Sequence, residues 1–532
     1  MTQPNLASPP HEAHRPERAP HGLPLGDRVV RPPRDHRVRS LRKVLGVGAL
    51  YSIGYGNLGS SIYYAMGITA VYALGATPLV LGIAGLLFVF TALTYAEGST
   101  MIPEAGGASS FARRGFNDLV SFVAGWALML DYIVIMAISA ITVPSYLGYF
   151  FPSLKASHAA AAWVGMGVIL VLMVVNVIGV KHTSGVNLAF CVLDLATQAA
   201  LLIVGGVLLL NLKPILGAVQ WGGSSAWPTP DMFVYSVSIA MVAYIGLESV
   251  SQMAEEARDV ARSIPRALLL SLATILVMHT GISTVALSAM RPQDLATQWS
   301  TDPVAGIAHH LPTVEFQSEV VALRVALNHL MAPWVAVLAS SILVIATNAG
   351  ILGVSRLAFS MGLHQQLPAP LVRLHGVFRT PYIAIIFFCG VAMALLIPSF
   401  SAPDILLKLG DLYSFGAMLA FTIAHASIIA LRFREPNVPR PFRPWGEIPV
   451  AGRRIPLSAV LGFLSTLAVW VVVVATHRWG RAVGFLWLLG GAATYGLYRW
   501  RRGLPMLGGP PAEAPQPAAP ELPAAAAPGE RR

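Results

Sequence analysis

The sequence predicts an all-α membrane protein with twelve transmembrane helices, and three observations support this: composition, run length and the placement of charge. Of the 532 residues, 55% are hydrophobic and only 11% are charged, and the mean hydropathy is +0.64. Soluble domains carry about 25% charged residues. The apolar residues gather in twelve runs that are long enough to cross a bilayer, which takes about 20 residues of helix.

We expect these runs to be helices, because a bilayer admits only helices and closed barrels as spanning structures. Polar tails flank them: residues 1–43 are basic and proline-rich, and residues 503–532 are rich in proline and alanine, so both are expected to be disordered. The membrane domain is thus predicted at 44–500. Its runs cover residues 44–73, 78–102, 118–151, 159–180, 186–212, 231–257, 264–290, 329–362, 380–400, 405–432, 455–476 and 480–500.

The distribution of Lys and Arg predicts the orientation. With a cytoplasmic N-terminus, 29 of these residues fall on the inner side and 7 on the outer side, which accounts for all 36. This split follows the positive-inside rule and predicts a cytoplasmic-membrane protein with both termini in the cytoplasm. The net charge of +11 therefore reflects topology, and no nucleic-acid partner is expected. Cys191 and Cys389 lie in apolar runs without metal-ligand spacing, so no metal or cofactor is expected either.

The first run contains a stretch that is poorly suited to a helix. Residues 54–61 hold three glycines, Asn57 and two serines, each of which lowers helix propensity. Backbone released from a helix at membrane depth is tolerated only against protein or a water-filled cavity. Such interrupted spans mark substrate sites in secondary transporters, although a Gly/Ser face for close helix packing is an alternative.

A second interruption is expected in the sixth run, where Gly246, Glu248 and serines interrupt an apolar helix about 190 residues later. Runs one to five (44–212) and six to ten (231–432) would then form an inverted repeat of two five-helix units, each beginning with a broken helix. The last two runs (455–500) are additional. Amides freed at a half-helix N-terminus attract a carboxylate, and freed carbonyls attract an ammonium group or cation.

Three carboxylates lie inside the apolar runs: Asp131, Asp194 and Glu248. An ionisable group at membrane depth costs about 2.5–3.5 kcal/mol on insertion scales, so each is a candidate for function. We expect them to carry a coupling proton or cation, or to face a polar cavity. For His279 and His425, helix packing is the favoured interpretation.

Five segments resemble motifs of the amino acid–polyamine–organocation (APC) superfamily, whose members have the LeuT-type fold. They are LGSSIYYAMG at 58–67, PEAGGASSFARRGF at 103–116, AYIGLESVSQMAEEARDVARSIPRAL at 243–268, NAGILGVSRLAFSMGLHQQLP at 348–368 and RFREPNVPRPFRPW at 432–445. In that superfamily, first-helix amides bind the substrate carboxylate and sixth-helix carbonyls bind its amine. The resemblance assigns the first role to Gly59, Ser60, Ser61 and Ile62, and the second to Ala243, Tyr244 and Gly246.

One departure from the superfamily pattern, and a second resemblance within the superfamily, leave alternatives open. Asp194 stands where the cationic amino-acid carriers of the superfamily have a lysine that couples transport to protons. The lysine-based proton switch of those carriers therefore cannot be carried over to this sequence. Other residues resemble bacterial potassium/proton importers: Tyr64, the pair Asp131-Tyr132, and Tyr413 match their potassium ligands, while Asn57 stands in place of an aspartate.

These patterns predict a permease for amino acids or related small amines that works by alternating access, coupled to protons or another cation. Runs one, two, six and seven are expected to rock against runs three, four, eight and nine. Potassium/proton symport is the alternative, and a non-transporting membrane sensor is a remote one. No nucleophile or metal-binding motif indicates an enzyme.

Overall fold

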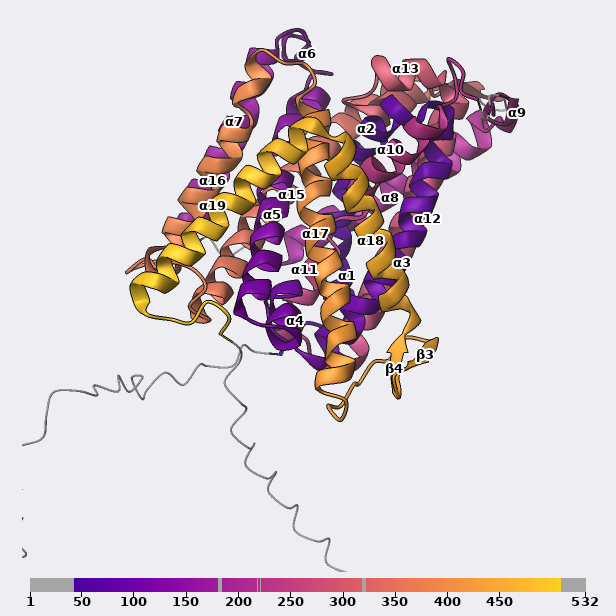
Figure 1. The fold of residues 1–532 in the computed structure, drawn as a ribbon. Helices are drawn as coiled ribbons and strands as arrows, with labels where there is room; N and C mark the ends of the chain where they lie inside the picture. The colour runs from indigo at the N-terminus through magenta and orange to yellow at the C-terminus, as the bar shows by residue number, and fades with distance from the viewer. Residues whose placement is uncertain (1–42, 180–183, 218, 221, 318–321, 509–532) are drawn as a thin grey trace, which may run out of the picture. The chain divides into compact units, whose positions relative to one another are not determined.

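The computed structural model describes residues 43–179, 184–217, 219–220, 222–317 and 322–508. The predicted tails therefore fall almost wholly outside the described residues. Long helices that lie side by side dominate the membrane domain (Figure 1). Within the described residues, ten helical stretches are long and apolar enough to cross a membrane. They are Ala65–Met101, Asp118–Leu147, His158–Ile178, Leu188–Leu209, Pro230–Gln252, Val260–Ala289, Leu327–Leu363, Tyr382–Phe400, Ile405–Arg434 and Leu457–Thr476.

The difference between ten stretches and twelve predicted runs arises at the two ends of the domain. The first run is divided into α1 (Val47–Gly59), the 3-10 turn η1 (Ser60–Tyr63) and α2 (Ala65–Ala73). Leu74 then adopts a positive φ of 47°, and the turn η2 (Leu74–Ala76) leads into α3 (Thr77–Met101), which packs against α2. The last run forms α19 (Arg478–Arg502), a helix that is too polar to be among the ten.

The core is centred on α5 (Asp118–Leu147), which packs against α15 (Leu327–Leu363) and α17 (Ile405–Arg434). Figure 1 shows these three helices together in the middle of the domain. The Asn117 side chain begins α5 by accepting a hydrogen bond from the Val120 amide at 3.0 Å, a typical N-cap.

Two packing groups surround this core. In one, α12 (Val260–Ala289) contacts both α1 and α3, and all three helices contact parts of the interrupted sixth run, which are α10 (Pro230–Ala240), η3 (Met241–Tyr244) and α11 (Glu248–Gln252). In the other, α7 (His158–Ile178) and α16 (Tyr382–Leu395) pack with α5 and α15. The remaining helices are α4 (Ala108–Gly115), α6 (Ser153–Ala156), α8 (Ser184–Leu209), α9 (Leu212–Gly217), η4 (Ala254–Glu256), α13 (Pro292–Thr297), α14 (Pro303–His309), η5 (Ala369–Val372), η6 (Ile397–Phe400) and α18 (Leu457–Thr476).

The all-α expectation needs a small amendment, because two short antiparallel hairpins join helices. One pairs β1 (Thr313–Gln317) with β2 (Ala322–Ala326), and the other pairs β3 (Glu447–Val450) with β4 (Arg453–Pro456). The second hairpin turns through Ala451 and Gly452, both at positive φ, as a type I′ hairpin turn requires.

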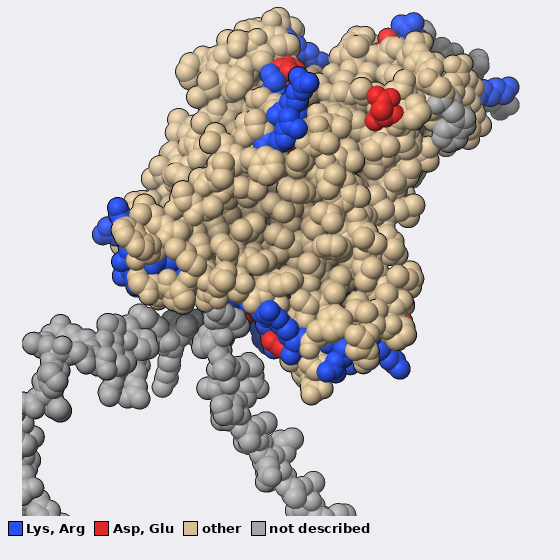
Figure 2. All heavy atoms as spheres, viewed as in Figure 1, with Lys and Arg blue, Asp and Glu red and all other residues tan. Residues whose placement is uncertain are grey.

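The surface has the charge distribution of a membrane protein. On the face in Figure 2, Lys, Arg, Asp and Glu lie toward two opposite ends, and the broad region between them carries none that are visible. Many large apolar side chains are exposed, such as Val207 at 79% and Leu486 at 70%. A lipid environment accounts for both features.

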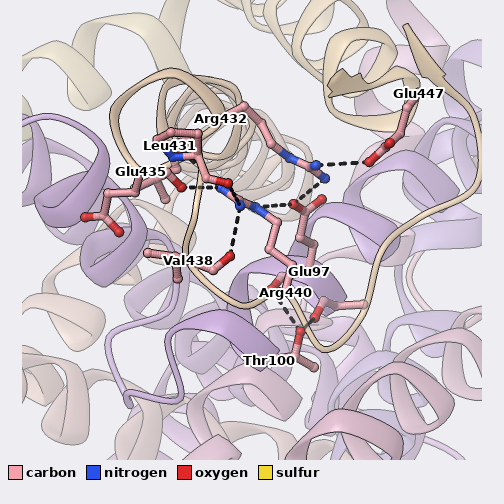
Figure 3. Close-up of polar contacts among 10 residues, drawn as sticks. Glu97, Thr100, Leu431, Arg432, Glu435, Val438, Arg440 and Glu447 are labelled. Atoms are coloured by element: carbon pink, nitrogen blue, oxygen red, sulfur yellow. Dashed lines mark hydrogen bonds and ion pairs between the residues drawn. The ribbon is translucent and has the colours of Figure 1, made fainter. Parts of the chain in front are cut away.

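Buried ion pairs connect α3 to the end of α17 (Figure 3). Glu97 of α3 is fully buried, and its Oε1 lies 2.6 Å from Arg432 Nη2 and 3.5 Å from Arg440 Nε. Arg432 also pairs with Glu447 of β3 at 3.0 Å. Arg440 caps the C-terminal end of α17 by donating to backbone carbonyls. Those carbonyls belong to Leu431, Glu435, Pro436 and Val438.

Candidate functional site

The first interruption lies between α1 and α2, deep in the protein. All residues from 54 to 70 are buried. α-Helical structure ends at Gly59 and resumes at Ala65, and between them Ser60 Oγ donates to the Asn57 carbonyl at 3.0 Å. Serine side chains that bond nearby carbonyls compete with regular helix geometry. At Gly59, a Cβ would lie 2.9 Å from Cζ of the Tyr55 ring, so a larger residue has no room there.

The second interruption separates η3 from α11. Ile245 is extended, with φ −71° and ψ 141°, and Gly246 has φ +118°, a conformation that glycine tolerates and other residues rarely adopt. The Gly246 amide donates to Glu248 Oε2 at 3.0 Å. The sixth run therefore loses its helix at the residues that the sequence indicated.

The two interruptions contact each other directly. The Asn57 side-chain amide donates to the Gly246 carbonyl at 3.3 Å. Ser61 Oγ lies 2.8 Å from the Ala243 carbonyl oxygen. Side chains of the first break thus bind backbone of the second, so carbonyl groups from one broken helix face the opened turn of the other.

A buried pair of carboxylates, Asp131 of α5 and Glu248 of α11, adjoins the interruptions. Both residues are 1% exposed, and they interact electrostatically with each other. Within the described part of the chain, both oxygens of Asp131 and Oε1 of Glu248 have no hydrogen-bond partner. Burying a carboxylate without hydrogen-bond partners costs free energy unless the group is protonated or balanced by a cation. The carboxylate pair is therefore suited to hold one or the other.

Tyrosines surround the carboxylate pair. The hydroxyls of Tyr95 and Tyr413 are buried and, among the described residues, also lack hydrogen-bond partners. Together with the carboxylates they form a group of unsatisfied oxygen atoms, the kind of ligand that hard cations and protons require. The tyrosines within electrostatic reach of Asp131 are Tyr64, Tyr95, Tyr132 and Tyr413.

Asp194 has a different environment, because donors saturate its carboxylate. Oδ2 accepts from the Tyr55 hydroxyl at 2.9 Å and from Gln198 Nε2 at 2.8 Å, and Oδ1 accepts from the Tyr63 hydroxyl at 2.5 Å. All three partners donate, which suits an ionised carboxylate, an acceptor without a proton of its own. Because Tyr55 lies on α1 and Tyr63 on η1, Asp194 of α8 joins the helix before the first break to the turn within it.

The structure thus brings most of the sequence-predicted site residues together, in two adjoining groups. The backbone group contains Asn57, Gly59, Ser60, Ser61, Ile62, Ala243, Tyr244 and Gly246, and the carboxylate group contains Tyr64, Asp131, Tyr132, Glu248 and Tyr413. Asp194 lies behind the first break instead.

Sequence reasoning missed Tyr55, Tyr63 and Gln198. Their role depends on a partner more than 130 residues away, except for Gln198, which lies one helical turn from Asp194. That i, i+4 spacing was the one available signal.

Comparison with known proteins identifies the family. A family described as amino acid permease matches residues 45–491, which is most of the chain. The chain belongs to the amino acid permease family. It is thereby a transporter of the APC superfamily, as the five motifs indicated, and not an enzyme.

The permease is similar to several proteins that are named as carriers. A branched-chain amino acid permease, BcaP of Bacillus subtilis (strain 168), is 26% identical over 487 residues, which cover 86% of this chain and 94% of the relative. A methylthioribose transporter from the same organism is 25% identical, with 68% and 74% coverage. The human large neutral amino acids transporter small subunit 2 is 24% identical, with 68% and 64% coverage.

Proposed function

We propose that the permease is a secondary active transporter that carries neutral amino acids, or related small amines, by alternating access. The observation that carries this proposal is the direct contact between two broken helices through Asn57–Gly246 and Ser61–Ala243. A solute that replaces these contacts would gain backbone donors from the first break and backbone carbonyls from the second. An amino acid presents a carboxylate to such donors and an ammonium group to such carbonyls.

The choice of a neutral amino acid rests on the site and on the relatives. Ile62, Ala243 and Tyr244 surround the breaks, and apolar or aromatic side chains such as these suit an uncharged substrate side chain. Two of the three relatives named above are described as carriers of branched-chain or large neutral amino acids. Leucine belongs to both descriptions and is therefore the first substrate to test.

We assign coupling to the carboxylate pair. Asp131 lies on α5, which packs with α7, α15 and α16, whereas Glu248 lies on α11, which packs with α1, α3 and α12. A proton or cation shared between them would favour one relative position of the two groups, and its loss would favour separation by charge repulsion. Asp194 is instead assigned to holding the first break, since donors already satisfy its oxygens.

The transport cycle that we propose uses twelve spans in a five-plus-five inverted repeat with two additional helices. The two packing groups match the rocking bundle and the scaffold expected of this architecture. We place the permease in the cytoplasmic membrane with both termini inside, on the strength of the Lys and Arg distribution.

The test is uptake of labelled leucine into proteoliposomes with an imposed pH gradient. We expect accumulation that excess unlabelled leucine abolishes. Asp131→Asn should retain leucine exchange but lose pH-driven accumulation; unchanged accumulation would remove Asp131 from coupling.

The alternative of potassium transport is tested with rubidium as the probe ion. Its uptake is measured in parallel for wild type and Asn57→Asp. Saturable rubidium uptake without leucine uptake would overturn the amino-acid assignment. Ligand binding without flux of either solute would favour a sensor.

A further inference from the structure

His279 lies directly behind the two breaks. It belongs to α12, is fully buried, and its Nε2 is 3.1 Å from Ser61 Oγ of the first break. Its Nδ1 lies 3.0 Å from the Ile275 carbonyl oxygen of its own helix. The ring also lies against Tyr244, with centroids 5.5 Å apart. The histidine therefore contacts one side chain from each of the two segments that the proposed function uses.

The partners of the ring determine its protonation. A carbonyl oxygen only accepts, so Nδ1 must carry a proton and donate to Ile275. Among the described residues, no carboxylate bonds or pairs with His279, and the one titratable side chain that faces the ring, Tyr244, donates its hydroxyl to the Leu81 carbonyl at 2.8 Å. A charged imidazolium would therefore be buried without a counter-ion, at a high cost. From these partners we assign a neutral ring whose Nε2 is an acceptor.

Ser61 has one hydroxyl proton and three acceptors within reach. They are the Leu58 carbonyl at 2.6 Å, the Ala243 carbonyl at 2.8 Å and His279 Nε2 at 3.1 Å. The ring nitrogen has no other donor among the described residues, and a buried acceptor without a donor costs about 1–3 kcal/mol. When the hydroxyl turns to His279, the Ala243 carbonyl is released.

We propose that His279 is a positioning residue that takes the Ser61 hydrogen bond when substrate binds, so that the Ala243 carbonyl is free to accept from the substrate's ammonium group. This inference rests on the proposed function and deepens it by naming the residue that selects for an amine. Without an acceptor at Nε2, the Ser61 hydroxyl would be shared only between the Leu58 and Ala243 carbonyls, and its bond to Ala243 would compete with the ammonium group.

Two polar substitutions of similar size separate this role from packing. In His279→Gln, the side-chain oxygen can occupy the position of Nε2, whereas His279→Asn is one bond shorter and reaches only the position of Nδ1. We expect Asn to raise the KM for leucine about tenfold, as loss of one hydrogen bond to a charged group implies, with little change in kcat. Gln should keep KM near that of wild type. Thermal melts would confirm that both variants fold.

The decisive readouts are the substrate's amine and a second-site suppressor. For 4-methylpentanoate, which resembles leucine without its ammonium group, inhibition of leucine uptake should be equal in wild type and His279→Asn. Adding Ser61→Ala to His279→Asn removes the competing hydroxyl and should bring KM back toward wild type.

Three results would overturn the inference: equal effects of Asn and Gln on KM, a parallel loss of 4-methylpentanoate inhibition, or no recovery with Ser61→Ala. If wild type takes up no amino acid, the proposed function fails, and the inference fails with it. If wild type takes up leucine and any of the three results is found, only the inference fails.

Discussion

Gly246→Ala is the sharpest test of the second break, because the structure predicts a local cost at a position in contact with the first break. Gly246 has φ +118°, and a non-glycine residue held in such a region costs about 1–3 kcal/mol. The added methyl carbon would also lie 3.1 Å from Asn57 Nδ2 and 3.2 Å from its Cγ. The Asn57 side chain would have to move, and with it the 3.3 Å hydrogen bond that joins the breaks.

We expect Gly246→Ala to fold and reach the membrane but to lose leucine uptake about tenfold or more, because small displacements of binding groups have large effects on rate. Uptake into proteoliposomes and a thermal melt of the same preparation measure the two quantities. Gly390→Ala is the matched control, since nothing lies within 4 Å of the added carbon on α16. Normal uptake by Gly246→Ala would refute the assignment of the second break to the substrate site.

Three further substitutions test other parts of the structure. Gly59→Val should abolish uptake while the protein still reaches the membrane, since its side chain would collide with Tyr55; normal flux would contradict this. Asp194→Asn should slow uptake but leave pH-driven accumulation intact, and retained exchange without accumulation would instead assign coupling to Asp194. Glu97→Ala should lower the free energy of unfolding by about 3–5 kcal/mol, because it leaves Arg432 buried with one partner fewer; an unchanged melting temperature in detergent would show that this ion pair contributes little.

Local chemistry made the interruptions predictable from the sequence. Glycine, asparagine and serine disfavour a helix wherever they occur. Residues 54–61 and Gly246 therefore predict breaks even when the fold is unknown. The buried carboxylates were found for a similar reason, since Asp131 and Glu248 are conspicuous within apolar runs.

The side-chain contacts of the site were not predictable, because they join segments that are far apart in the sequence. The sequence does not reveal that Asp194 meets Tyr55 and Tyr63, and we interpreted His279 as a packing residue because a lone histidine gives no indication of its neighbours. The structure places it 3.1 Å from Ser61, 218 residues away. The twelve-span count also depends on tertiary context, since the first span is divided and the last is comparatively polar.

A structure determined with saturating leucine tests most directly whether the two broken helices together hold one amino acid. We expect leucine between residues 57–62 and 243–248, with its carboxylate at the amides of the first break and its ammonium group at the carbonyls of Ala243 and Gly246. Leucine bound elsewhere, or continuous helices through both segments, would contradict this expectation.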